Sequence, residues 1–189
     1  MFKTVRLVLM LLLVATACQA ALAQKVKLAT SMGDVVIQLD ADKAPRTVAN
    51  FVQYVKDGHY DGLIFHRVIA GFMIQAGGYD ATMKEKATRP SIPLESRNGL
   101  SNARGTIAMA RTSVPDSASS QFFINVADNL RLDAANAADG NGYAVFGKVV
   151  SGMDVVDKIR AVPVGDKAGH QNVPQQPVVI RKATLESDK

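Results

Sequence analysis

Short runs rich in β-branched and aromatic residues divide most of this chain of 189 residues, and turn-forming residues separate them. Runs of about four to eight such residues are typical of strands. An opening hairpin is expected from residues 26–30 and 34–39, with Gly33 in its turn. Six further strands are expected at residues 63–68, 72–75, 106–111, 121–126, 144–150 and 178–185. The pattern favours one mainly β domain of antiparallel strands, closed or nearly closed so that few sheet edges are exposed.

Two helices are expected beside the strands. The first follows Pro45, a residue tolerated in a first helical turn, and ends near Gly58. A second, shorter helix is expected at residues 153–160. Residues 79–105 form a long polar connection, which we expect to be either functional or mobile. The apolar residues of the first helix follow the i, i+3, i+4, i+7 spacing: Val48, Phe51, Val52 and Val55.

Composition limits the classes of function. Hydrophobic residues make up 48% of the chain and charged residues 21%, as is ordinary for a globular domain. The formal charge is +5, but basic residues alternate with acidic ones, as at Lys84-Glu85-Lys86, so a nucleic-acid partner is not expected. The three histidines, His59, His66 and His170, have no metal-like spacing. We therefore expect no metal and no cofactor.

The amino-terminal residues predict export. Residues 1–23 combine Lys3 and Arg6 with an apolar run at 7–14 and a small-x-small site at 21–23, the pattern of a cleavable signal peptide. The folded domain then spans residues 24–189. Because the apolar run is shorter than the roughly 20 residues needed to cross a bilayer, no membrane span is expected. An alternative is a lipid anchor on Cys18, the only cysteine of the chain.

One stretch, residues 65–78, places a permanent hydrogen-bond donor beside an apolar surface. Arg67 lies a few residues before Phe72 and Met73, and its guanidinium carries five donors that cannot lose their charge. Such a pairing suits an apolar ligand with one polar bond to be manipulated. Rotation about a peptide bond before proline is such a case, because resonance opposes it by ~18–20 kcal/mol without any bond being broken.

Residues 65–78 closely resemble the central motif of the cyclophilin family of peptidyl-prolyl cis-trans isomerases. A second block, residues 108–111 followed by 119–124, resembles the other signature of that family. The resemblance implies a closed eight-stranded antiparallel β-barrel with a helix capping each end. It also implies that the enzyme accelerates rotation about X-Pro bonds in folding proteins.

The resemblance further implies roles for individual residues. Arg67 matches the catalytic arginine, Gln75 and Gln121 match residues that line the groove, and backbone groups near Ala110 and Arg111 would hold the peptide. Tyr143 stands where many eukaryotic relatives have a histidine. The residues that match the proline pocket are Phe72, Met73, Phe123 and Leu132.

Two departures from the family pattern carry expectations. Arg111 stands where asparagine is usual, and its charge should alter the preference for residues that flank proline. Arg131 stands where the family has a tryptophan that contacts the inhibitor cyclosporin, and the chain has no tryptophan at all. We therefore expect weak cyclosporin binding.

Two other classes of function remain as alternatives. A hydrolase would use Ser119 or Ser120 with His66, although no Gly-x-Ser-x-Gly elbow is present. A binding module or chaperone holdase would grip proline-containing segments in the same pocket without catalysis. The preferred prediction is a periplasmic isomerase, monomeric, whose partners are unfolded or newly exported polypeptides containing proline.

Overall fold

The computed structural model describes residues 24–186, and the fold below concerns these residues. The predicted signal peptide and Cys18 lie outside them. Within the described part, no helix has both the length and the apolar character needed to cross a membrane.

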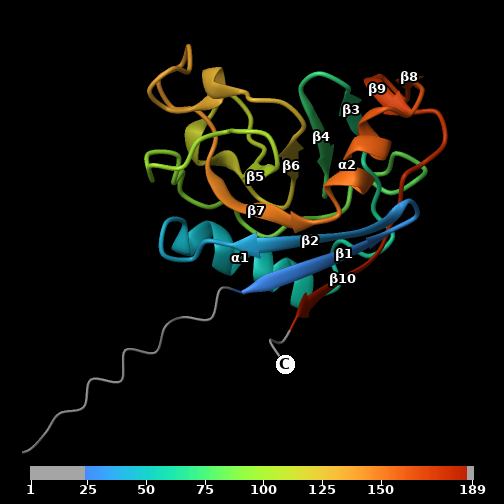
Figure 1. Ribbon diagram of the computed structural model, residues 1–189, viewed down its shortest axis with the longest axis horizontal. Helices are drawn as coiled ribbons and strands as arrows, with labels where there is room; N and C mark the ends of the chain where they lie inside the picture. The colour runs from blue at the N-terminus through green and yellow to red at the C-terminus, as the bar shows by residue number, and fades with distance from the viewer. Residues whose placement is uncertain (1–23, 187–189) are drawn as a thin grey trace, which may run out of the picture.

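Eight strands form one antiparallel sheet that curls around an apolar interior (Figure 1). Along the sheet the order is β10-β1-β2-β7-β5-β6-β4-β3. A separate hairpin, β8 (Val164–Lys167) with β9 (His170–Pro174), was not predicted. The eight strands are β1 (Lys25–Thr30), β2 (Gly33–Leu39), β3 (Arg67–Ile69), β4 (Met73–Ala76), β5 (Thr106–Met109), β6 (Phe122–Asn125), β7 (Val145–Ser151) and β10 (Ile180–Glu186).

The closed barrel that we expected is wrong, because the sheet is a curled half-barrel. Its ladder ends at β3 and β10, which do not pair with each other. The strand expected at 63–68 is broken: Ile64 makes only an isolated bridge to Val179, and regular pairing begins at Arg67. Residues 62–65 form hydrogen bonds or isolated bridges with residues 178–180 on one side and residues 79–80 on the other, but they do not form a regular strand. No single strand can therefore continue the ladder across the gap.

Both predicted helices are present and cover the same interior. They are α1 (Pro45–Lys56) and α2 (Met153–Arg160). The apolar stripe expected on α1 is buried, and the Phe51 ring lies 5.1 Å from Tyr60, 5.5 Å from Phe122 and 5.1 Å from Phe146, measured between ring centroids. Such aromatic contacts add to the hydrophobic term that stabilises the core.

The long connection at 79–105 supplies a side chain that binds the first turn of α1. The Glu95 carboxylate accepts hydrogen bonds from the backbone N–H of Thr47 at 2.8 Å and of Arg46 at 3.2 Å. These are donors that a helix cannot satisfy within its own first turn, and the residue before Pro45 supplies no side-chain cap. A distant loop therefore caps α1.

The two faces of strands β4, β5 and β6 belong to different apolar clusters. Because successive side chains of a strand point to opposite sides, Ile74, Phe122 and Ile124 join the interior. Their neighbours Met73 and Phe123 join a second cluster on the outer face. This outer face carries the candidate site.

Candidate active site

A row of directly paired residues crosses the outer face of the sheet. Arg67 of β3 pairs with Gln75 of β4, Gln75 pairs with Phe123 of β6, and Phe123 pairs with Ala108 of β5. Residues directly opposite each other in antiparallel strands point to the same side, with their Cβ atoms about 5 Å apart. The register therefore places the arginine on the face that holds the apolar cluster.

The Arg67 side chain is exposed and uncommitted. No hydrogen bond or salt bridge engages its guanidinium among residues 24–186. Its donors are thus available to a ligand that lies along the row. An arginine held by a carboxylate would have to break that pairing first.

The predicted proline-pocket residues come together in the outer cluster. Met73 is 2% exposed and Phe123 is 4% exposed, and Phe72 and Leu132 pack against them while partly open to solvent. Ala110 and Tyr143 belong to the same cluster, at its rim. An apolar cluster with partly exposed members can pack against a prolyl ring and exclude water from one side of it.

The two predicted glutamines contact each other beside this outer cluster, where Gln75 pairs with Phe123. Gln75 donates from Nε2 to Oε1 of Gln121 at 2.9 Å, and the Ala110 N–H donates to the Gln121 carbonyl at 2.9 Å. A Cβ added to Gly78 would lie 2.6 Å from Nε2 of Gln121. The glycine at this position therefore leaves the space that the Gln121 side chain occupies.

The charged group of the Arg111 side chain is not accessible to solvent or to a ligand. The side chain is only 2% exposed, and its guanidinium forms an ion pair with Asp139. The expectation that its charge selects residues flanking proline required an accessible guanidinium. The structure instead encloses it, and only the backbone of Ala110 and Arg111 remains a candidate for holding a peptide.

A chain of buried polar side chains supports the pocket from behind, and sequence reasoning missed it. Asn129 donates to the Phe72 carbonyl and to Oδ1 of Asn125, both at 2.7 Å. Asn125 donates to Oδ1 of Asn102 at 3.2 Å, and Asn102 donates to Asp133 at 3.0 Å. The only signal was one polar residue, Asn125, that ends an otherwise apolar strand. Buried networks in which every member is satisfied hold their surroundings rigidly.

His66 is buried beside Arg67 and is neutral at physiological pH. Its ring packs on Tyr79 with centroids 4.8 Å apart, and Nδ1 has no hydrogen-bond partner in the structure. Burial, together with the smaller effects of the nearby His170 and Arg67, lowers the pKa of His66 to about 4.

The serines considered for a hydrolase have other roles. The Ser120 hydroxyl is buried and donates to the Gly77 carbonyl at 2.8 Å, and the Ser119 carbonyl accepts from Asn50. No hydrogen bond joins either serine to His66 in the described chain. The arrangement of nucleophile and base that a serine hydrolase needs is therefore not formed.

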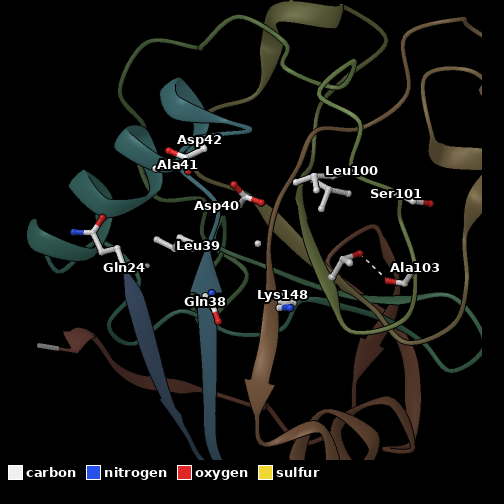
Figure 2. Close-up of a pocket in the computed structure, with 13 residues that line it drawn as sticks. Gln24, Gln38, Leu39, Asp40, Ala41, Asp42, Leu100, Ser101, Ala103 and Lys148 are labelled. Atoms are coloured by element: carbon white, nitrogen blue, oxygen red, sulfur yellow. Dashed lines mark hydrogen bonds between the residues drawn. The ribbon is translucent and has the colours of Figure 1, made fainter. Parts of the chain in front are cut away.

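A separate cavity of about 760 Å³ lies over the neighbouring strands β2 and β7. Figure 2 shows Asp40 near its centre, with Leu100 and Ser101 on the opposite wall. None of the predicted site residues lines it. Leu100 and Val145 line this cavity and also belong to the outer cluster, so the two lie next to each other.

Residues 24–186 contain no group of three or more histidine, cysteine, aspartate or glutamate side chains arranged to hold a metal ion.

Comparisons with known proteins agree with this fold. The model of the cyclophilin type peptidyl-prolyl cis-trans isomerase family matches residues 25–185. A peptidyl-prolyl cis-trans isomerase of Acinetobacter baylyi is 57% identical over 86% of this chain and 85% of its own. Peptidyl-prolyl cis-trans isomerase B of Escherichia coli is 54% identical over 82% of this chain and 96% of its own. A crystal structure of a cyclophilin type isomerase from Cryptosporidium parvum, determined in the presence of the dipeptide Ala-Pro, superimposes with a TM-score of 0.75 at 27% identity, covering 87% of this chain and 100% of its own.

The chain belongs to the cyclophilin-type peptidyl-prolyl cis-trans isomerase family. It is an enzyme, and its activity is the cis-trans isomerisation of peptidyl-prolyl bonds. These relatives support isomerase activity and do not favour the alternative of a non-catalytic binding module.

Proposed function

We propose that Arg67 is the catalytic residue and that the outer cluster binds the prolyl ring. The observation that carries this proposal is the row Arg67–Gln75–Phe123–Ala108, which aligns an uncommitted guanidinium with an apolar cluster on one face of the sheet. The pocket residues in this proposal are Phe72, Met73, Phe123 and Leu132, with Tyr143 at the rim.

The reaction requires a donor at the imide nitrogen of the X-Pro bond. A hydrogen bond from Arg67 to that nitrogen draws its lone pair out of conjugation with the carbonyl, so the C–N bond loses double-bond character and rotates. The nitrogen accepts well only when the amide is twisted. The interaction is therefore stronger in the transition state than in the planar ground state, which is the condition for catalysis.

The remaining site residues position the chain. Gln75 and Gln121 are linked by a hydrogen bond and form one side of the groove. Backbone groups of Ala110 and Arg111 pair with the extended peptide in this proposal, in the manner of an added strand. Apolar walls around the ring reduce the dielectric constant near Arg67 and strengthen its effect on the twisted amide.

Substitution Arg67→Ala tests the catalytic role. We expect kcat for an Ala-Pro peptide to fall by about 10²- to 10³-fold, as when one preorganised donor is removed from an enzyme site. Peptide affinity should fall only a few fold, and unfolding by urea should be unchanged because the side chain has no partner within the described residues. A protease-coupled isomer assay measures the rate. An unchanged rate with weaker binding would instead support a proline-binding module or holdase.

The proposal extends to cyclosporin, which we expect to bind weakly. Arg131 lies over the Phe72 ring, with its Cζ 4.7 Å from the ring centroid. A charged group thus covers part of the surface that an apolar ligand would need. Titration of the purified protein at ordinary salt checks this, and a nanomolar dissociation constant would contradict it.

The proposed substrates are unfolded, newly exported polypeptides in a periplasm. This part rests on the composition of residues 1–23 and on the slow exchange of X-Pro isomers, which limits refolding. The protein is proposed to act as a monomer released by cleavage before Gln24, with a lipid anchor at Cys18 as the alternative. The mass of the mature chain, isolated from the periplasmic and membrane fractions, distinguishes a chain cleaved before Gln24 from a chain that carries a lipid on Cys18.

A further inference from the structure

The guanidinium of Arg111 is buried, and each of its three nitrogen atoms donates a hydrogen bond. Its side chain is 2% exposed, although arginine is usually among the most exposed residues. Nε donates to the Gly142 carbonyl at 2.8 Å, and one terminal nitrogen donates to the Thr112 carbonyl at 2.9 Å. The other terminal nitrogen binds the Asp139 carboxylate. The planar group thus joins the end of β5 to the loop that precedes β7.

The same guanidinium stacks on one wall of the proline pocket. Its Cζ lies 4.7 Å from the centroid of the Tyr143 ring. The Tyr143 ring also contacts Phe123, with centroids 5.7 Å apart and planes at 79°. Tyr143 is therefore in contact with a fixed cation and with the phenylalanine that is proposed to bind proline. Stacking of this kind suits arginine, because its charge is spread over a plane.

Asp139 is itself held in place. Its Oδ1 accepts hydrogen bonds from the backbone N–H of Asn141 at 2.9 Å and of Gly142 at 3.2 Å. The Asn141 bond, followed by the Arg111 bond, lowers the pKa of Asp139 to about 2, so the carboxylate stays ionised at neutral pH. The anion that holds Arg111 is thus fixed by its own loop.

The loop that contains Asp139 and Gly142 also contacts Leu132, another residue of the proposed proline pocket. The Tyr143 N–H donates to the Leu132 carbonyl at 2.9 Å. Gly142 has a φ of +65°, and a Cβ added there would lie 2.5 Å from the Leu132 oxygen. The chain therefore passes against Leu132 as closely as glycine allows. Any change that loosens this loop changes the position of Tyr143 relative to Leu132.

We propose that Arg111 and Asp139 are positioning residues that fix Tyr143 against Phe123 and thereby set the width of the proline pocket. This inference rests on the proposed function, because it assigns the pocket to the prolyl ring. Its consequence is selectivity for ring size: a pocket of fixed width accepts the five-membered ring of proline and resists a larger one. Neither residue needs to touch the substrate with its side chain to have this effect.

The test compares two peptides that differ by one methylene. Matched substrates carry Ala-Pro or Ala-pipecolate, whose six-membered ring is larger by one carbon. One misfitting methylene in an apolar pocket is worth about 10-fold or more in kcat/KM, so the unmodified enzyme should prefer Ala-Pro by at least that ratio. Asp139→Ala should reduce this preference about threefold or more, and Arg111→Lys should reduce it by less, because lysine keeps the charge but not the stacked plane.

Arg104→Ala is the matched control. It also breaks an arginine–aspartate pair, with Asp157 at 2.7 Å, but both side chains are more than a third exposed and lie outside the outer cluster. Its preference for Ala-Pro over Ala-pipecolate should equal that of the unmodified enzyme.

The outcomes separate a positioning role from a merely structural one. Lower thermal stability with an unchanged preference in both Asp139→Ala and Arg111→Lys would overturn the proposal. If Asp139→Ala fails to fold, Arg111→Lys alone decides, by the same ratio. An unmodified protein inactive on both peptides would contradict the proposed pocket function rather than this inference.

Discussion

The two faces of strands β4, β5 and β6 are built from the same segments but have different compositions. On the inner face Ile74, Phe122 and Ile124 are fully buried, and their neighbours are other core residues. On the outer face Phe123 is also buried, but its row ends in the exposed Arg67 and the partly exposed Gln75. The inner face is complete within the protein, whereas the outer face leaves apolar walls and donors available to a ligand.

The difference shows how a small domain separates stability from function. The period of two along a strand assigns alternate residues to each face, so one segment of four residues contributes both to the core and to the site. Changes on the inner face should therefore affect unfolding first, and changes on the outer face should affect catalysis first. The following substitutions test this separation, from the largest expected effect to the smallest.

Phe122→Ala should have the largest effect on stability. Its ring is fully buried and makes edge contacts with Phe51 and Tyr60, so the free energy of unfolding should fall by about 3–5 kcal/mol. Urea denaturation measures this loss. The matched substitution Phe123→Ala, one residue along β6, should cost less stability and raise KM for an Ala-Pro peptide instead. Equal losses of stability, with no difference in KM, would refute the separation of the two faces.

Acid should destabilise the protein through His66, which is buried beside Arg67 and packs on Tyr79. The pKa of this histidine is about 4 in the folded protein and about 6.5 in an unfolded chain, so the unfolded state binds a proton more readily. Its contribution is therefore fully present above pH 6.5 and is lost as the pH falls toward 4. A difference of about 2.5 pKa units corresponds to about 3 kcal/mol.

His66→Gln isolates this contribution from other titrating groups. The variant should show a flatter dependence of unfolding free energy on pH between about 6.5 and 4. Burial also lowers the pKa of His59, so some dependence of the same sign should remain. Identical pH profiles for the two proteins would show that His66 does not titrate differently on folding.

Gln75→Ala should have the smallest effect on stability. The substitution removes one partly buried hydrogen bond to Gln121, worth about 0.5–1.5 kcal/mol. KM for an Ala-Pro peptide should nevertheless rise, because Gln121 loses the partner that orders it. The isomerase assay and urea denaturation on the same sample compare the two effects. A stability loss as large as that of Phe122→Ala, with KM unchanged, would place Gln75 with the core.

Local patterns in the sequence predicted most of the fold. The i, i+3, i+4, i+7 spacing predicted α1 with its buried stripe, and alternation with turn residues predicted the strands of the main sheet. Both signals depend on residues close together in the chain. Whether the sheet closes into a barrel does not: it depends on whether residues 62–65 pair as a regular strand with residues far along the chain, and here they make only separate contacts such as the hydrogen bond from Gly62 to Ile180. The β8–β9 hairpin was missed because its strands contain few β-branched residues.

The candidate site was predictable only in part. The two sequence blocks identified Arg67 and the apolar pocket, and the strand register brings those residues together. Asp139 and the Asn129–Asn125–Asn102 chain were not identified, because polar residues in loops have the same composition whether they face solvent or support a buried network. Their roles depend on contacts across 4 to 57 positions of sequence, most of which no local pattern reports.

The alternation along β6 also limits how such a chain can change in length. Inserting one residue just before Phe122 would exchange the directions of Phe122 and Phe123. The outer cluster would then lose the Phe123 ring, and the interior would lose the Phe122 ring. Loops such as 79–105 carry no such constraint. A gain or loss of one residue should therefore be less disruptive in those parts of the loops that make no cap or buried contact, whereas within β6 only substitutions should be tolerated.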